Sequence, residues 1–396
     1  MDIIAGGLEQ VPGYSFSAIE CGIRYPNRLD YCLIYAEQDC NASGMFTTNR
    51  VCAAPVKLCR ARIDGVIRAI LINATNANAC TGEDGYRDAE SLTADIGARL
   101  NLPPVSVLMA STGIIGRRLP IETMINAHSR LAASLSRDNG KLIPHAIMTT
   151  DTMPKALCIS FNAAGREYHI AGTAKGAGMI APQMATLLCF ILTDAPVAKA
   201  DLDRLFRSSI DTTLNAITID GDMSTNDTAI ILSPKSPSPL TDQRDLNAFA
   251  EALHAVLGRL AEMLIDDGEG TTKRVRVNVR RAACSDDAKR IARAVAESLL
   301  VKTAFFGNDP NWGRIAAAAG RAGVPLDEQS LCISFNDVPV LVNGRPLEAN
   351  LEALTAIMAE RSFQVTIDIA LGDGEWSMLT TDISTDYVRI NAEYST

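Results

Sequence analysis

The sequence has few of the residues from which metal-binding, disulfide-stabilised and nucleic-acid-binding proteins are built. Its four histidines are dispersed with no H-x-x-x-H spacing, so they predict no metal site. Its ten cysteines form no C-x-x-C pair and several lie in apolar runs, which indicates a reducing cytoplasm rather than a disulfide framework. A net charge of -9 with only short basic runs argues against a nucleic-acid partner.

The sequence also lacks the signatures of membrane insertion and of cofactor binding. No run is long and apolar enough to span a membrane, and no basic segment precedes an apolar one after Met1, so we expect a cytoplasmic protein with no membrane partner. The glycines at 176–178 have neither the Gly-Lys-Ser/Thr ending of a phosphate loop nor a third glycine in dinucleotide spacing. Residues 220–224 resemble a calcium loop, but its sixth and twelfth positions are Thr225 and Ile231. We expect no cofactor and no metal.

What the sequence does contain is the composition of a globular enzyme with a large core, 47% hydrophobic and 21% charged residues. Its 396 residues suggest two domains or one large α/β unit. Alternating apolar residues predict strands at 274–280 and 363–371, and a helix with one apolar face is expected after Asp245 as N-cap. Tight hairpin turns are expected at 343–344 and 372–374. These alternating signals predict an α/β or α+β chain with substantial sheet.

The most informative stretch is residues 175–188, KGAGMIAPQMATLL, which places a threonine in a loop of small residues. If the Ala185–Thr186 bond breaks, Thr186 becomes N-terminal, and its freed α-amine, which titrates at about pH 8, can act as the base for its own hydroxyl. One residue then supplies both nucleophile and base. The same residues are also compatible with an ordinary glycine-rich loop followed by a buried apolar helix at 184–192.

A second polar run follows a short apolar stretch at 105–110 that suits a buried strand. Thr112 and Gly113 would then lie at the exit of that strand. A hydroxyl and a backbone N–H in such a place can be aimed at a developing oxyanion, as acyl transfer requires. On these residues alone, a plain turn is the alternative.

Further polar and glycine-rich runs follow one another along nearly the whole chain. They are NANACTG at 76–82, STGIIG at 111–116, TTDTMPK at 149–155, DGDMSTND at 220–227, DGEG at 267–270, KTA at 302–304, GNDPNWGR at 307–314 and INAEYST at 390–396. With these runs and with residues 175–188, in this order, the chain resembles the ornithine acetyltransferases, also called glutamate N-acetyltransferases, of arginine biosynthesis.

The resemblance implies the fold and the maturation of the chain. It implies a DmpA/ornithine-acetyltransferase-like α/β fold, an αββα sandwich that cleaves itself into two chains. Residues 1–185 would form an alpha chain and residues 186–396 a beta chain that begins with the nucleophile, and together they would make one catalytic unit. Two such units would associate as a heterotetramer of two alpha and two beta chains. Periodicity alone gives neither this topology nor the oligomer.

The resemblance also implies the reaction. N-acetylornithine would give its acetyl group to Thr186, ornithine would leave, and glutamate would take the acetyl group in a ping-pong sequence. Some members also accept acetyl-CoA as donor, which the sequence leaves open. A self-processing amidase or aminopeptidase, in which water takes the acyl group, is the alternative. An unprocessed binding protein would be indicated if Thr186 stayed internal.

The resemblance assigns roles to individual residues as well. The hydroxyl of Thr112 and the N–H of Gly113 would form the oxyanion hole. Lys175 suits a carboxylate, Thr152 can donate from its hydroxyl, and Glu269 can accept from an ammonium group. The family's substrate-binding positions correspond to Thr152, Lys175, Thr186, Glu269, Asn391 and Thr396.

One short run departs from the family pattern. Residues 73–75, Asn-Ala-Thr, precede Asn76, where relatives often carry a serine and a glycine. The close packing at this point is therefore left open, although no proposed catalytic group is changed.

Overall fold

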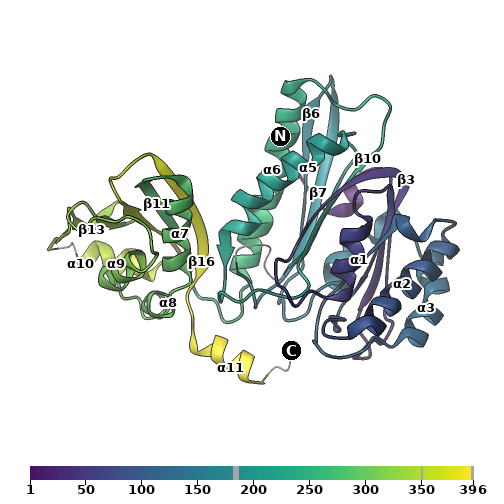
Figure 1. Ribbon diagram of the computed structural model, residues 1–396, viewed down its shortest axis with the longest axis horizontal. Coiled ribbons are helices and arrows are strands. Elements are labelled where there is room, and N and C mark those ends of the chain that lie inside the picture. The colour runs from purple at the N-terminus through teal and green to yellow at the C-terminus, as the bar shows by residue number, and fades with distance from the viewer. Residues whose placement is uncertain (182–186, 349–350, 394–396) are drawn as a thin grey trace.

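The computed structural model describes residues 1–181, 187–348 and 351–393, and Figure 1 shows a larger and a smaller body side by side. The larger body contains a sheet with the strand order β1-β6-β7-β8-β10-β3-β4-β5, in which β2 also pairs with β3. Its strands are β1 Asp2–Ile4, β2 Tyr14–Ile19, β3 Tyr31–Phe46, β4 Ile67–Asn73, β5 Val107–Ser111, β6 Lys155–Ala163, β7 Arg166–Lys175, β8 Leu188–Thr193 and β10 Thr228–Pro234.

This first sheet forms two facing layers because β3 is long enough to belong to both. The first half of β3 pairs with β2 and β4, and its second half pairs with β10, with a register shift between Tyr35 and Cys40. One apolar core lies between the layer of β6, β7, β8 and β10 and the layer of β2 to β5. Successive residues alternate between cores, so that Phe190 of β8 is in this inner core and Ile191 is in an outer one.

Helices cover the outer face of each layer. α5 Lys199–Thr212 and α6 Gln243–Asp266 share a core with β6, β7, β8 and β10. α2 Gly82–Arg99 and α3 Ile121–Ala133 share another with β3, β4 and β5. The order is helix, sheet, sheet, helix, which confirms the expected αββα sandwich. The remaining helices of this body are η1 Leu8–Gln10, α1 Ala54–Arg62, η2 Pro104–Ser106, η3 Arg137–Leu142, α4 Ile143–Ala146 and η4 Leu214–Ala216.

The long helix predicted after residue 245 is present as α6, but it begins earlier. Asp242 is its N-cap, because its carboxylate accepts the N–H of Arg244 at 2.8 Å. Asp245 lies inside the first turn and accepts instead from the N–H of Ala164, at 2.7 Å. The predicted N-cap was therefore wrong by three residues, since the sequence offers two aspartates and only the fold decides which one caps. The apolar face of the helix is buried as predicted.

The smaller body contains a second sheet with the order β14-β13-β12-β15-β11-β16-β9, covered on one face by helices. The predicted strands at 274–280 and 363–371 correspond to β11 and β15. The elements are β9 Ile217–Thr218, β11 Arg274–Ala282, α7 Ser285–Ala296, α8 Leu299–Phe306, α9 Trp312–Gly320, β12 Cys332–Phe335, β13 Val338–Val342, β14 Arg345–Pro346, α10 Leu351–Ala359, β15 Ser362–Asp368 and β16 Gly374–Thr381.

Three local predictions meet different outcomes. Residues 343–344 connect the antiparallel pair β13 and β14, as expected of a hairpin. Residues 372–374 do not close a hairpin, because β15 and β16 both pair with β11, one on each side. The alternative of a helix at 184–192 is wrong over its described part, since residues 188–193 form β8 between two strands.

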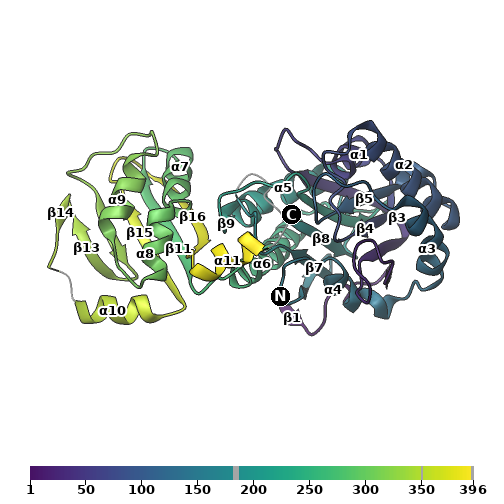
Figure 2. The same cartoon turned by 90° about the horizontal axis from the view of Figure 1, so that it is seen from below.

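The chain enters the smaller body briefly at β9, passes into it again at residues 267–273, which join α6 to β11, and leaves it after β16. There it continues into α11 Thr385–Glu393, which Figures 1 and 2 show reaching from the smaller body toward the larger one. All ten cysteines are free thiols. None of the helices in the described ranges is long and apolar enough to cross a membrane.

Candidate active site

Five of the predicted site residues line one cavity of about 140 Å³. Thr112 and Gly113 come from the exit of β5, Lys175 from the end of β7, Glu269 from the connection between the two bodies, and Asn391 from α11. Residues far apart in the sequence thus meet where the sandwich faces the smaller body. Ala185, Thr186 and Thr396 lie outside the described residues.

The turn after β5 is held against the turn after β4. The N–H of Thr112 donates to the carbonyl of Asn73 at 3.0 Å, and the N–H of Ile114 donates to the carbonyl of Thr75 at 3.3 Å. Gly113 has a φ of 130°, and a Cβ added there would lie 2.2 Å from the carbonyl carbon of Thr75. Only glycine fits this close approach. Within the described residues no acceptor contacts the Gly113 N–H, so it is free to donate to a ligand.

The departure at residues 73–75 falls at this same contact. Thr75 has a φ of 74°, in the left-handed region that glycine adopts most readily. Its hydroxyl is buried and has no hydrogen-bond partner in the described part of the chain. The close packing is therefore preserved with threonine, at the cost of a strained backbone and an unsatisfied hydroxyl.

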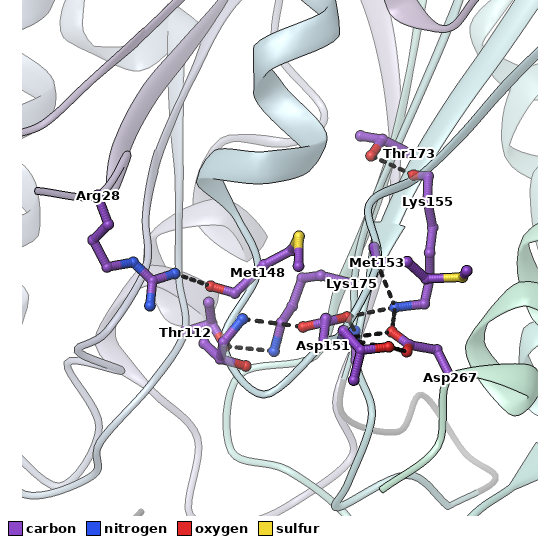
Figure 3. Close-up of polar contacts among 12 residues, drawn as sticks. Arg28, Thr112, Met148, Asp151, Met153, Lys155, Thr173, Lys175 and Asp267 are labelled. Carbon is purple, nitrogen blue, oxygen red and sulfur yellow. Dashed lines mark hydrogen bonds and ion pairs between the residues drawn. The ribbon is translucent and has the colours of Figure 1, made fainter. Parts of the chain in front are cut away.

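Lys175 is the cation of the cavity. Its Nζ donates to Oγ1 of Thr112 at 3.2 Å, as Figure 3 shows, and its side chain is buried. Burial lowers the pKa of Lys175, and the nearby carboxylate of Asp151 opposes that shift. Because Thr112 accepts from the lysine, the hydroxyl proton of Thr112 is left to point elsewhere. The pair is therefore arranged to present an O–H donor beside the Gly113 N–H.

Behind Lys175 lies a buried network of two aspartates and a second lysine (Figure 3). Oδ1 of Asp151 accepts from Nζ of Lys155 and from the N–H of Gly176, both at 2.7 Å. Nζ of Lys155 also donates to Oδ2 of Asp267 at 2.5 Å. Burial raises the pKa of Asp151, but the charges of Lys175 and Lys155 outweigh burial and hold it at about 2. Asp151 is thus a fixed negative charge that orients the backbone of Gly176, the residue after Lys175.

Thr152 takes part in this network rather than in the cavity lining. Its N–H donates to Oδ2 of Asp267 at 3.1 Å, and its hydroxyl donates to Oδ1 of the same carboxylate. It therefore links the loop at 149–155 to the loop at 267–270, which carries Glu269. Arg28 holds the start of the first loop by donating to the carbonyl of Met148 at 2.7 Å (Figure 3).

Glu269 and Asn391 form the side of the cavity that faces the smaller body. Nδ2 of Asn391 donates to Oε2 of Glu269 at 2.8 Å, and the backbone N–H of Glu269 donates to the carbonyl of Ala177 at 2.8 Å. A Cβ on Gly178 would lie 2.4 Å from Oε2 of Glu269. The glycine thus lets the carboxylate reach the cavity, whose lining also contains the cation of Lys175.

Other residues of the cavity were not predicted from the sequence. Asp220 and Tyr387 line it, and the Tyr387 hydroxyl donates to Oδ2 of Asp220 at 3.3 Å. Burial raises the pKa of Asp220 to about 6. Asn226 donates from Nδ2 to the carbonyls of Ala77 and Ser111, at 2.6 and 2.8 Å. For Asp220 and Asn226, the only signal in the sequence was the polar run at 220–227. We interpreted its individual residues only as a resemblance to a calcium loop.

A much smaller cavity, of about 10 Å³, adjoins the same residues. It is lined by Thr112 and Lys175 together with Leu187, which directly follows Thr186 in the chain, and with Asp227. A larger cavity of about 700 Å³ lies on the open face of the second sheet and contains none of the predicted site residues. Across the described ranges no group of three or more histidine, cysteine or acidic side chains is arranged to hold a metal ion.

Comparison with known proteins gives consistent results over the chain. The model of the ArgJ family matches residues 15–396. An arginine biosynthesis bifunctional protein ArgJ from Geobacter sulfurreducens is 46% identical over 391 residues, 98% of this chain and 100% of that protein. The protein of the same name from Caldanaerobacter subterraneus is 41% identical over 404 aligned positions, 100% of both chains.

Two solved structures were also found. The arginine biosynthesis bifunctional protein argJ of Bacillus halodurans has 33% identity and a TM-score of 0.49, covering 52% of this chain and 98% of that one. An ornithine acetyltransferase of Mycobacterium tuberculosis, complexed with ornithine, has 31% identity and a TM-score of 0.43, covering 46% of this chain and 97% of that one.

Proposed function

The chain belongs to the ArgJ family, and on that premise we propose that it carries acetyl from N2-acetyl-L-ornithine to L-glutamate on Thr186. Membership makes it an acyltransferase of arginine biosynthesis with ornithine acetyltransferase activity. The observation that carries the choice of residues is the buried contact between Lys175 and Thr112 beside Gly113, in a cavity next to Leu187.

The proposed mechanism begins with cleavage of the chain. The Thr186 hydroxyl attacks the Ala185 carbonyl, and the peptide nitrogen leaves from that carbon, which converts the amide into an ester. Water then hydrolyses the ester to give a carboxylate on Ala185 and a free α-amine and hydroxyl on Thr186. The products are an alpha chain of residues 1–185 and a beta chain of residues 186–396. The β-branch of threonine restricts χ1 and so limits the directions that the hydroxyl can take.

Acetyl transfer uses the same nucleophile. The α-amine of Thr186 takes the hydroxyl proton as the oxygen attacks the acetyl carbonyl of N-acetylornithine. The Thr112 hydroxyl and the Gly113 N–H donate to the resulting oxyanion, and collapse expels ornithine, whose nitrogen receives the proton. The amine of glutamate then attacks the acetyl ester, which releases N-acetylglutamate and restores the threonine hydroxyl.

Charges of both signs in the cavity lining support amino-acid substrates. Lys175 offers a buried cation to a carboxylate, while Glu269, held by Asn391, offers a carboxylate to an ammonium group. Thr152 supports this arrangement through Asp267, and Thr396 is proposed as a further substrate contact. Substrates with both charges would therefore be oriented along the cavity.

Two further features stay proposals. The relatives are named bifunctional proteins, which favours acetyl-CoA as a second donor. Attack of Thr186 on its thioester would expel the thiol of coenzyme A and give the same acetyl-threonine. The assembly that we propose is a heterotetramer of two alpha and two beta chains in the cytoplasm.

Denaturing mass spectrometry with N-terminal sequencing tests the proposal. The 42.4 kDa chain should give pieces of about 20 and about 23 kDa, in proportion to their lengths, the larger beginning at Thr186. Thr186→Ala should stay intact and inactive, whereas Thr186→Ser, which keeps a hydroxyl, should still be cleaved. Processing of the alanine variant would refute the nucleophile. Release of acetate in place of N-acetylglutamate would identify an amidase instead.

A further inference from the structure

The loop between β9 and β10, residues 219–227, contacts the chain on both sides of the cleavage segment 182–186. Ile180 precedes this segment and Leu187 follows it, and both are buried. Each is bound by an aspartate side chain and by a neighbouring backbone N–H of the same loop region. The run that no function has yet explained, DGDMSTND at 220–227, supplies both aspartates.

On the preceding side, Asp220 accepts hydrogen bonds from two consecutive backbone groups. Its Oδ1 accepts from the N–H of Ile180 at 2.8 Å, and its Oδ2 accepts from the N–H of Met179 at 2.5 Å. The carbonyl of Ile180 accepts in turn from the N–H of Ile219 at 2.8 Å and from the hydroxyl of Thr218 at 3.1 Å. Ile180 is therefore fixed at both of its backbone polar groups.

On the following side, Asp227 repeats the pattern. Its Oδ1 accepts from the N–H of Leu187 at 2.9 Å, and the carbonyl of Leu187 accepts from the N–H of Thr228 at 3.0 Å. Thr228 and Leu188 are paired residues of the parallel strands β10 and β8. The side chain of Asp227 thus binds the backbone N–H immediately before the strand ladder begins.

We infer that Asp220 and Asp227 form a carboxylate clamp that positions both flanks of the Ala185–Thr186 bond for cleavage. The inference rests on the proposed function, since it concerns that bond. Attack by Thr186 on the carbonyl before it requires a defined path between two fixed points, because an unrestrained loop would rarely bring hydroxyl and carbonyl into line. The clamp supplies those points from one short loop, so the distance between them is set locally.

The surroundings of Asp227 distinguish it from an ordinary structural aspartate. Its side chain is buried, and its Oδ2 has no hydrogen-bond partner in the described ranges. Asp227 also lines the small cavity that Thr112 and Lys175 share with Leu187. Asp227 therefore acts where the proposed nucleophile joins β8, as a positioning residue.

Asp382 offers a matched control elsewhere in the fold. It is equally buried, and its Oδ1 accepts from the N–H groups of Thr272 and Lys273, both at 2.9 Å. It contacts neither flank of the cleavage segment. Loss of its side chain should lower stability without changing the rate of cleavage.

The test measures processing half-times of the full chain made by cell-free translation and quenched at intervals. Asp220→Ala and Asp227→Ala should each lengthen the half-time by about tenfold, as loss of the acceptor for a buried backbone N–H implies. Asp227→Asn should recover most of the rate, because its amide oxygen still accepts from the N–H of Leu187. Asp220→Asn should recover only part of it, because one amide oxygen can accept from Ile180 or from Met179 but not from both. Asp382→Ala should mature like the wild type.

Several results would overturn the clamp. Wild-type half-times in either alanine variant would do so, as would an Asp227→Asn variant that keeps the wild-type melting temperature but fails to recover. If Asp227→Ala does not fold, Asp220→Ala decides the question by itself. Failure of the wild type to be cleaved before Thr186 would instead refute the proposed function, so the two ideas fail in different ways.

Discussion

The two bodies differ in how firmly they hold the residues that they contribute to the cavity. The sandwich presents Thr112, Gly113 and Lys175 at strand ends, with sheet and helices packed on both sides. The helices of the smaller body, α7 to α10, share a core with its sheet, and the cavity receives Glu269 and Asn391 from segments that connect that body to the sandwich. Groups that stabilise a transition state need fixed positions, whereas groups that bind substrate ends tolerate more movement.

Two buried lysines, one in each body, also differ in the groups that accept their hydrogen bonds. Lys155, in the sandwich, lies between the carboxylates of Asp151 and Asp267. Lys302, in the smaller body, donates instead to the hydroxyls of Thr380 and Thr381, at 2.8 and 3.1 Å, and to a carbonyl. Burial lowers the pKa of Lys302 to about 7. One lysine therefore belongs to a charged network beside the cavity, and the other satisfies neutral oxygens in a core.

The largest effect on turnover is expected from a substitution in the turn after β5. Gly113→Ala should lower kcat by about 10² to 10³, because the added Cβ would displace the N–H donor. Gly116→Ala is the control, since Gly116 also has a positive φ but a Cβ there meets nothing within 4 Å. It should cost about 1 kcal/mol of stability and leave kcat unchanged. Steady-state kinetics of both variants would decide, and a wild-type kcat for Gly113→Ala would exclude the oxyanion role.

A substitution on the facing side should affect binding more than turnover. Glu269→Gln removes the charge and keeps the shape, so KM for acetylornithine should rise about tenfold while kcat changes little. Substrate titrations at fixed glutamate would measure both constants. The surface carboxylate of Glu251, exposed on α6, gives the matched control Glu251→Gln, which should change neither. A fall in kcat without a change in KM would place Glu269 with the catalytic groups and erase the contrast.

The smallest effect on activity is expected at Lys302. Its pKa in the folded state is lowered from 10.5 to about 7, so between those values the unfolded chain binds the extra proton. Stability from this group therefore rises as pH rises from about 7, by at most about 1.4 kcal/mol per pH unit. Lys302→Met should lose that rise, and turnover should stay within about twofold of the wild type.

Chemical denaturation at pH 7, 8 and 9 would measure this difference. Lys199→Met, at a partly exposed lysine paired with Asp203, should keep the wild-type slope. Equal slopes in Lys302→Met and the wild type would mean that Lys302 keeps its proton in the fold.

Local patterns predicted local features of the fold. The apolar run at 105–110 predicted a buried strand, which the structure has as β5 at 107–111, after a 3-10 helix at 104–106. The apolar face of α6 and the alternating residues of β11 follow from periodicity, because each pattern is set by neighbours in the sequence. The run at 184–192 was ambiguous between helix and strand, as short apolar runs are. The pairing that makes residues 188–193 a central strand depends on β7 and β10, which lie elsewhere in the chain.

The sequence likewise predicted some residues of the site and missed others. The resemblance identified Thr112, Gly113, Lys175, Glu269 and Asn391, and the fold brings these five together. It did not reveal Asp220 and Asp227, because their partners are backbone N–H groups about 40 residues earlier, which leave no mark in the sequence. Thr152 was expected to donate to substrate, and only the fold brings its hydroxyl to Asp267.

The strand order has a consequence for the mature enzyme as a chemical species. Cleavage before Thr186 would leave β8 and β10 on one chain, inserted between β7 and β3 of the other. Neither piece could complete the sheet alone, so the two would stay together as long as the fold persists. Once unfolded, however, they would have to find each other by diffusion. Refolding would change from a first-order to a second-order process, and recovery of the mature enzyme would depend on its concentration.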